Sequence, residues 1–316
     1  MQNHPRDLSL ASAPVSSLFE QPRSPDDWRA YELSAGALES FDARGFVTGV
    51  RILDGAQVDT LRDELARLVH PSHPGNSLFY EYHSNESVDP SQVLDHALGA
   101  WRVEPGFPDI LWAPAFRMAA FQLLGGPVRQ FHDQLFAKPA GDGGVVAWHQ
   151  DYSYWTWTRP MAHLSCWIAL DDATTENGCL WYVPGSHRWG LLPITGLTGD
   201  MNAIDRVLDD EQRKAFANRV AIELPKGHAT FHHPLLIHGS YENRSPRPRR
   251  ATVLNVVRDG VRSNPAALDP AKYAKLSFPI LPQDEALGGR FYPLLFDPDR
   301  ELGARRAAVP VIARAS

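Results

Sequence analysis

The chain has 316 residues, a hydrophobic fraction of 43% and a net charge of −6, so it lacks the excess of Lys and Arg that nucleic-acid binding requires. No apolar run approaches the ~18 residues of a membrane span, and residues 1–27 lack the apolar stretch of a secretory signal. We therefore expect a cytoplasmic protein without a membrane partner, and two cysteines support neither a disulfide scaffold nor a thiolate zinc site.

The first third of the chain predicts a helical layer. Residues 1–28 are rich in Ser, Pro and charge, which is typical of a flexible arm. Residues 33–50 predict a short helix followed by a strand within GFVTGVRIL. A helix over 56–69 follows, capped by Asp54, because its apolar residues recur at helical spacing.

A loop rich in Pro, Ser and Asn is predicted over 71–90. A further helix within 114–124 ends before Gly125 and Gly126, a pair that stops helices.

From about residue 130 to 260 the chain predicts a β core. Short β-rich runs recur between turn clusters: VRQFHDQLFAK, VVAWHQDY, HLSCWIAL, CLWYV, VAIEL, ATFHH and ATVLNVV. One helix, over 203–217, interrupts them, and the segment from about 264 is Pro-rich and mostly irregular. Because no linker separates two cores, we expect residues 29–316 to form one domain, a β-sandwich or barrel with flanking helices.

The motif WHQD places His149 and Asp151 two residues apart, so on a strand both side chains share one face. The motif alone is weak, because roughly 1.5 such His-x-acid matches are expected by chance. His238, in a second His-rich segment, could complete a ligand set of two imidazoles and one carboxylate with His149 and Asp151. That set suits non-haem Fe(II) oxygenases, although zinc hydrolases also use such ligands.

The alternation of side-chain direction along a strand also predicts a pair of anion-binding residues, Ser240 and Arg249. If His238 points into the barrel, Ser240 does too, and Arg249 begins a strand whose inward face also carries Ala251, Val253 and Asn255. An inward arginine beside a metal site can hold the far carboxylate of an organic acid. Arg250 faces the other way.

These motifs resemble the phytanoyl-CoA dioxygenase family of Fe(II)/2-oxoglutarate-dependent oxygenases. The resemblance covers about residues 45–259 and is carried by WHQD, NGCLWYVPGSH and HHPLLIHGSYENRSPRPRRA. The family's pattern is His-x-Asp, a distal His, Ser two residues later and Arg eleven residues later, and every member of it is present. The resemblance implies a double-stranded β-helix, or jelly roll.

The resemblance also implies site roles. His149, Asp151 and His238 would bind iron, while Arg249 and Ser240 would bind 2-oxoglutarate. Trp167, eighteen residues after the first ligand, would lie near that co-substrate, and O₂ would be the oxidant. Because Asp151 is present, where related halogenases carry a small residue, hydroxylation of a small molecule or a related oxidation is favoured over halogenation.

Further candidates precede and follow the first ligand. Gln134 and Lys138 are candidates for contacting 2-oxoglutarate, since relatives such as ectoine hydroxylase use a Gln in this region. The aromatic run after Asp151 offers substrate candidates: Tyr152, Tyr154, Trp155 and Arg159.

Other conspicuous residues are predicted to be structural. One of the pair His232 and His233 can support the ligands, since one strand face cannot present both. Cys166 is expected to pack in the core. Asn177, Gly178, Pro184 and His187 are expected to form scaffold.

Two rival functions remain open. A zinc-dependent hydrolase would use the same ligands but has no evident need for Arg249 and Ser240. A non-catalytic binding protein on the same fold would tolerate the loss of a ligand.

Overall fold

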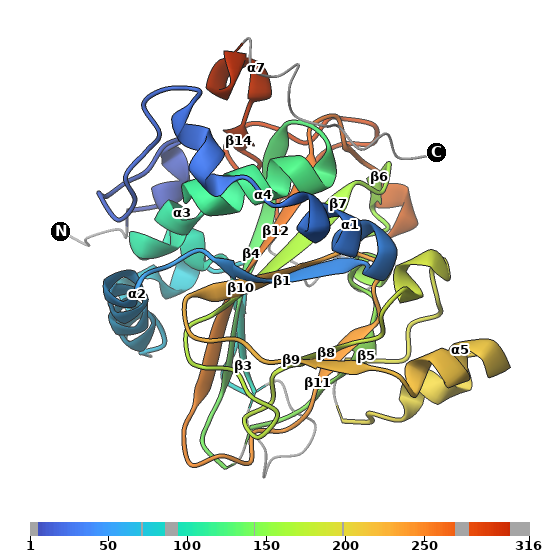
Figure 1. The fold of residues 1–316 in the computed structure, drawn as a ribbon. Coiled ribbons are helices and arrows are strands. Elements are labelled where there is room, and N and C mark those ends of the chain that lie inside the picture. The colour runs from blue at the N-terminus through green and yellow to red at the C-terminus, as the bar shows by residue number, and fades with distance from the viewer. Residues whose placement is uncertain are drawn as a thin grey trace.

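Two antiparallel sheets face each other in this protein, with helices packed outside the larger sheet (Figure 1). The computed structural model describes residues 6–70, 72–85, 94–141, 143–197, 199–268 and 278–303. The mainly β jelly-roll architecture with flanking helices is confirmed. Within these ranges, no helix is long and apolar enough to span a bilayer.

The larger sheet has eight strands, in the order β1-β10-β7-β12-β4-β3-β2, with β14 also paired to β4. Their bounds are β1 Phe46–Arg51, β2 Glu81–His83, β3 Asp95–Leu98, β4 Val128–Lys138, β7 His163–Ala169, β10 His228–His232, β12 Arg249–Arg258 and β14 Leu294–Phe296. Strand β12 pairs with β4 on one side and with β7 on the other. The centre of the sheet is therefore built from three strands that are distant in sequence.

The smaller sheet has four strands in the order β5-β11-β8-β9. Their bounds are β5 Val146–His149, β8 Leu180–Tyr182, β9 Val220–Ile222 and β11 His238–Ser240. A separate ribbon pairs β6 Thr158–Arg159 with β13 Arg262–Ser263.

The helices have clear sequence signals. Their bounds are α1 Ala35–Arg44, α2 Gly55–Leu68, α3 Gly106–Ile110, α4 Pro114–Leu124, α5 Asp210–Phe216 and α7 Pro298–Glu301. Asp54 and Gln57 form a capping box at the start of α2, and Gly125 ends α4 in the left-handed conformation. The predicted helices over 56–69 and 114–124 are thus confirmed.

Short 3₁₀ helices fill several connections: η1 Leu8–Leu10, η2 Asp27–Tyr31, η3 Pro74–Leu78, η4 Ala100–Arg102, η5 Asp151–Tyr154, η6 Ser186–Arg188, η7 Ala203–Arg206 and η8 Pro265–Ala267.

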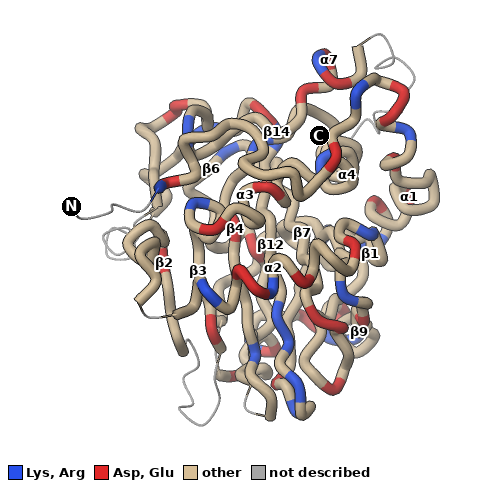
Figure 2. Tube along the Cα trace, turned by 90° about the vertical axis from the view of Figure 1, so that its left-hand side faces the viewer, with Lys and Arg blue, Asp and Glu red and all other residues tan. Residues whose placement is uncertain are grey.

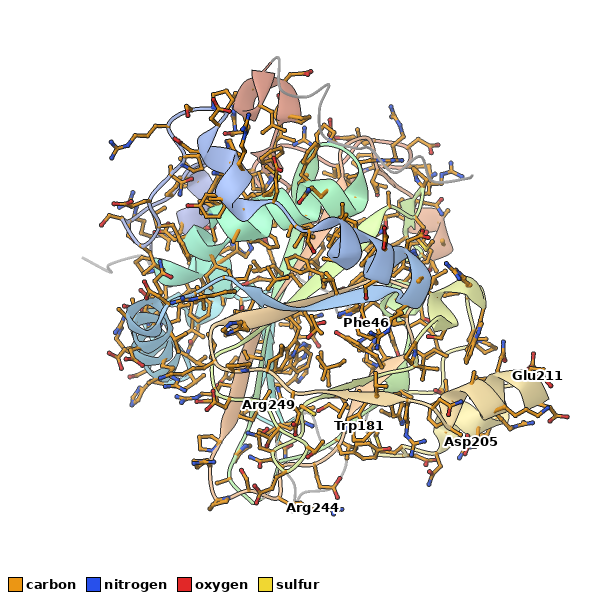
Figure 3. All side chains as sticks on the ribbon, viewed as in Figure 1. Phe46, Trp181, Asp205, Glu211, Arg244 and Arg249 are labelled. Carbon is orange, nitrogen blue, oxygen red and sulfur yellow. The ribbon has the colours of Figure 1, made fainter. Side chains whose placement is uncertain are left out.

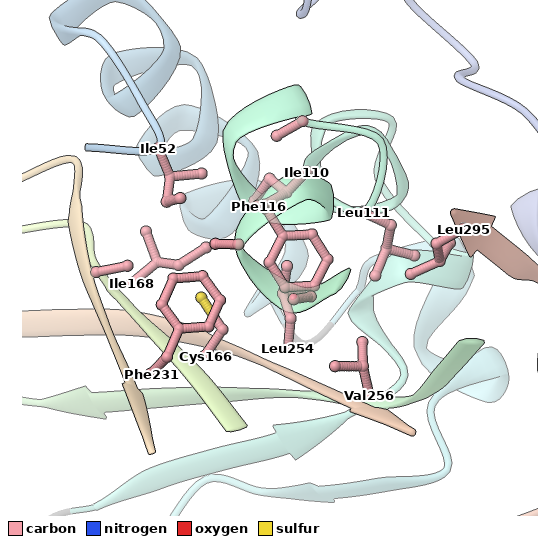
Figure 4. Close-up of a cluster of buried hydrophobic side chains, with 14 of the residues drawn as sticks. Ile52, Ile110, Leu111, Phe116, Cys166, Ile168, Phe231, Leu254, Val256 and Leu295 are labelled. Carbon is pink, nitrogen blue, oxygen red and sulfur yellow. The ribbon is translucent and has the colours of Figure 1, made fainter. Parts of the chain in front are cut away.

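The largest core lies between α4 and the outer face of the larger sheet (Figure 4). Phe116 of α4 stacks on Phe231 of β10, with ring centroids 6.2 Å apart. Cys166 and Leu254 are buried in the same cluster. Each such large apolar side chain stabilises the fold by roughly 1.5–3 kcal/mol, so this packing fixes the sheet that carries the site. Cys166 is a core residue, as predicted.

Two predictions about elements were wrong. The helix predicted over 203–217 is two pieces, η7 and α5, because Asp209 caps α5 in a box with Gln212 and so starts a new helix. The loop predicted over 71–90 contains η3 and strand β2, which pairs with β3; residues 71 and 86–90 lie outside the described ranges.

The predicted flexible arm is held by specific contacts over its described part. The Asp109 carboxylate accepts backbone N–H groups of Val15 at 2.6 Å and of Ser16 at 3.0 Å. Trp28 is buried, edge-on to Phe296. The segment 6–28 therefore lies on the helical layer, while the division into domains stays a prediction. Charged positions of both signs are interspersed along the chain (Figure 2).

Candidate metal centre

Three predicted ligands converge in the interior of the jelly roll. His149 ends β5, Asp151 begins η5 and His238 begins β11, and the two histidines are direct partners across β5 and β11. One ligand atom from each of the three lies within 4.8 Å of the others. Strand pairing thus joins residues that are far apart in sequence.

Each histidine is oriented by its second ring nitrogen. Nδ1 of His149 lies 2.8 Å from the carbonyl of Ala147, and Nδ1 of His238 lies 3.0 Å from that of Leu236. A carbonyl only accepts, so Nδ1 carries the proton and Nε2 keeps its lone pair. Both Nε2 atoms face Oδ1 of Asp151, at 3.4 and 3.5 Å.

The protonation states fit a cation site. Burial would raise the pKa of Asp151, but the surrounding imidazoles, His238 first and then His149 and His232, hold it well below its ordinary value. Burial, with His149 alongside, lowers the pKa of His238 well below its ordinary value. An ionised carboxylate with a neutral imidazole is the form in which these side chains bind metal.

A cavity extends from the three ligands toward Arg249. Its lining, besides the ligands, consists of Gln134, Phe136, Val146, Trp167, Leu180, His232, Gly239, Ser240, Arg249, Val253 and Asn255. Four of the five residues predicted to contact the co-substrate line this cavity: Gln134, Trp167, Ser240 and Arg249. Gln134 lies on β4.

Arg249 is a buried cation with unused hydrogen-bonding capacity. Only 2% of the residue is exposed, and Figure 3 places it inside the molecule whereas Asp205 and Glu211 lie at the periphery. Its Nη2 lies 3.4 Å from Ser240 Oγ, and its guanidinium stands 5.4 Å from the centre of the Trp167 ring. Nε and Nη1 have no hydrogen-bond partner within the described residues.

A buried guanidinium without a carboxylate partner is costly, so this end of the cavity favours an anion. Arg250, the next residue, faces outward and forms an ion pair with Asp171, at 2.8 Å. The opposite directions of the two arginines agree with the predicted parity.

Lys138 does not reach the cavity in the way predicted. Its buried Nζ donates to Ser240 Oγ at 2.7 Å and to the Tyr241 carbonyl at 2.5 Å, and it is absent from the lining. Burial, and then repulsion from Arg249, lowers its pKa well below the ordinary value. Lys138 therefore holds Ser240 from behind.

Asn255 lines the cavity but was not singled out from the sequence. Its side-chain nitrogen lies 3.3 Å from Nδ1 of His132, while Oδ1 has no partner among the described residues. The signal was present, because Asn255 belongs to the inward-facing positions that parity assigned to β12. A polar side chain at an inward-facing strand position was the sequence feature that could have identified Asn255.

The predicted substrate residues lie outside this cavity. Tyr152 donates to the Thr158 carbonyl, and Trp155 packs against Phe131 in a separate aromatic cluster. Tyr154 lies beside His149 and lines a second, smaller hollow. Arg159 is exposed and paired with Asp284 at 2.5 Å, because it sits on the outer ribbon β6–β13.

His232 and His233 point in opposite directions, as strand alternation requires. His232 lies 3.0 Å from Asp151 Oδ2, whereas His233 packs near Phe41 and His187 on the α1 side.

The remaining scaffold residues support the turn before β8. Asn177 accepts the Thr174 N–H and donates to the Asp172 carbonyl. Gly178 has a φ of +81°, and a Cβ there would lie 2.5 Å from the Tyr241 carbonyl oxygen, so only glycine fits. Pro184 and His187 follow in the next turn, where His187 hydrogen-bonds the Asp42 carbonyl.

Comparison with known proteins agrees with this geometry. Residues 41–251 match the family Phytanoyl-CoA dioxygenase (PhyH). A phytanoyl-CoA dioxygenase of Arabidopsis thaliana is 37% identical over 167 residues, which cover 52% of this chain and 56% of the relative. An L-proline trans-4-hydroxylase of Streptomyces griseoviridis is 30% identical over 220 residues, covering 62% of this chain and 81% of the relative. The chain spans about half the length of several curated relatives that it matches.

Solved structures share the fold. The non-heme alpha ketoglutarate dependent carbocyclase SnoK from nogalamycin biosynthesis has a TM-score of 0.65 at 21% identity, over 88% of this chain and all of that one. EctD from S. alaskensis, solved with 2-oxoglutarate and 5-hydroxyectoine, has a TM-score of 0.59 at 23% identity, over 83% of this chain and 85% of its own.

Proposed function

Because the chain belongs to the phytanoyl-CoA dioxygenase family, we propose that it is an Fe(II)- and 2-oxoglutarate-dependent oxygenase that hydroxylates a small molecule. The observation that carries the proposal is the coexistence of two features in one cavity. Two histidines and a carboxylate converge at one place, and a buried, partly unpaired Arg249 lies at another. A divalent cation and an organic dianion together would satisfy both.

The donor set suits iron. Two imidazoles and one carboxylate leave three positions of an octahedral ion free, enough for a chelating 2-oxo acid and O₂. When bound, Fe(II) supplies the activation of O₂, coupled to oxidative decarboxylation of 2-oxoglutarate to succinate and CO₂. His149, Asp151 and His238 are the proposed ligands.

The chain's other residues position the co-substrate. Arg249 and Ser240 bind its far carboxylate, and Lys138 keeps the Ser240 hydroxyl in place from behind. The Trp167 ring beside Arg249 and the side chains of Phe136 and Val253 make the middle of the cavity apolar, which matches the methylene carbons of 2-oxoglutarate.

One relative supports a proposal about the substrate class. L-proline trans-4-hydroxylase acts on a free amino acid, and the chain covers most of that relative's length. We therefore place small polar molecules, amino acids first, ahead of CoA thioesters.

The proposal is tested by incubating the protein with Fe(II), ascorbate and 2-oxoglutarate and measuring succinate, with amino acids and acyl-CoA thioesters as trial substrates. The wild type should form succinate and consume O₂, and the Asp151→Ala variant should not. Full succinate formation by Asp151→Ala would refute the assignment. Zinc as the only tightly bound metal, with no O₂ consumption, would favour the hydrolase instead.

A further inference from the structure

The two oxygens of the Asp151 carboxylate have different partners. Oδ1 faces the Nε2 atoms of His149 and His238. Oδ2 accepts a hydrogen bond from Ser165 Oγ at 2.6 Å and lies 3.0 Å from His232 Nε2. Neither Ser165 nor His232 belongs to the proposed ligand set, so one oxygen faces the cation site while the other is engaged by two donors.

The two donors come from directly opposed strand positions. His232 of β10 and Ser165 of β7 are partners in the antiparallel register, so their side chains stand together on one face of the sheet. Both residues are buried, with 2% and 0% of their surface exposed. The pair is therefore a fixed part of the sheet.

His232 is in turn oriented by Tyr182. The Tyr182 hydroxyl lies 2.9 Å from His232 Nδ1, and Tyr182 is fully buried against Phe46. In its metal-binding, ionised form the Asp151 carboxylate can only accept, which would assign the His232 proton to Nε2 and leave Nδ1 to accept from the tyrosine. Hydrogen bonds thus run in one direction, from Tyr182 through His232 to Asp151.

We propose that Ser165 and His232 act as positioning residues that restrict Asp151 to binding the metal through Oδ1 alone. A carboxylate with both oxygens free can chelate a cation and occupy two coordination positions. With Oδ2 engaged, Asp151 takes one position, which leaves three for the 2-oxo acid and O₂. This inference rests on the proposed iron site.

A rival role for His232 is that of a fourth protein ligand. The described residues whose ligand atoms converge within 4.8 Å are His149, Asp151 and His238, without His232. Its Nε2 instead lies 3.0 Å from Asp151 Oδ2, the oxygen that does not face His149 and His238. The experiment below also tests this rival role, because a His232→Phe variant that had lost a metal ligand would lose metal binding.

The test uses cobalt(II)-loaded protein, whose visible spectrum reports coordination geometry without turnover. The variants are Ser165→Ala, His232→Phe and the double variant, with His232→Gln as the conservative replacement that retains an N–H donor. His233→Gln is the matched control, since it alters the adjacent histidine, which faces the α1 side. Circular dichroism establishes that each variant is folded, and the single variants serve if the double variant is not.

We expect the double variant to bind Co(II) but to show a changed visible spectrum. Its Kd for 2-oxoglutarate should rise about 10- to 100-fold, by analogy with the loss of metal affinity or activity that follows removal of groups that orient metal ligands. His232→Gln should restore most of the wild-type spectrum and affinity, and His233→Gln should match the wild type.

An unchanged spectrum and an unchanged Kd in the folded double variant would overturn the inference, and so would loss of Co(II) binding in His232→Phe. The spectrum remains readable even if the wild type forms no succinate. A failure of the proposed function is therefore distinguishable from a failure of this inference.

Discussion

Replacing Arg249 by Met should stabilise the protein while abolishing its response to 2-oxoglutarate. Met keeps much of the apolar volume of the arginine side chain but removes the charge. Burial lowers the pKa of Arg249 from 12.5 to about 10, which measures how unfavourable the charged form is inside the cavity. The same substitution removes the proposed contact with the far carboxylate of 2-oxoglutarate.

The size of the effect follows from that pKa. Since a tenfold change in an equilibrium corresponds to about 1.4 kcal/mol, the buried charge costs the folded state about 3 kcal/mol. For a base with a depressed pKa, this cost is fully present below about pH 10 and fades at higher pH. The lost contact with Trp167 offsets about 0.5–2 kcal/mol. We therefore expect Arg249→Met to raise the free energy of unfolding by about 1–2 kcal/mol at pH 7.5.

The assay is urea unfolding in a buffer free of sulfate, phosphate and carboxylates, because such anions would themselves pair with Arg249. Each protein is also measured anaerobically with Mn(II) and 2-oxoglutarate. At a ligand concentration of 100 Kd the wild type should gain about 2.7 kcal/mol, and Arg249→Met should gain almost nothing.

Arg250→Met is the matched control. Arg250 faces outward and pairs with Asp171, so its loss should reduce stability and leave the 2-oxoglutarate response intact. The reasoning is refuted if Arg249→Met loses stability as Arg250→Met does, or if it keeps the full response to 2-oxoglutarate.

Three further substitutions test other parts of the structure. Asp151→Asn should weaken Mn(II) binding, measured by titration calorimetry, by at least about tenfold, because a neutral amide replaces an ionised ligand; equal affinity would contradict the ligand assignment. Asp171→Asn should cost about 1–2 kcal/mol in urea unfolding at pH 7, since the carboxylate bridges two half-buried arginines that lower its pKa against the effect of burial. The cost of Asp171→Asn should shrink as pH falls below about 4, and a cost that does not change with pH would contradict the ion-pair explanation. Burial raises the pKa of Glu64 to about 7, so stability should decline from pH 5 to 7, and Glu64→Gln should flatten that decline; parallel pH profiles would speak against the assignment.

The site was more predictable from sequence than its surroundings. His238 and Ser240 on β11 and Arg249 on β12 could be placed because side-chain direction alternates along a strand. His149 ends β5, and Asp151 begins η5 just beyond it, so the offset of two residues still brings both side chains to the site.

Interactions across the fold were less predictable. Lys138 satisfies the same parity as Gln134, yet its Nζ binds a carbonyl beyond Ser240, a contact that depends on how β4 and β11 approach each other. The chain leaves strand β5 after His149, and the aromatic run follows η5 and then β6, so Trp155 and Arg159 do not continue the alternation of β5. The break between η7 and α5 depends on Asp209, whose capping role competes with helix continuation.

The pairing of His149 with His238 has a consequence for folding kinetics. The local pair of His149 and Asp151 exists in any extended chain, but the third ligand arrives only when β5 and β11 have joined across about 90 residues. The central sheet also consists of strands paired with distant partners, a topology associated with slow folding. Metal capture should therefore follow closure of the jelly roll, so that the order of assembly is chain first and cation last.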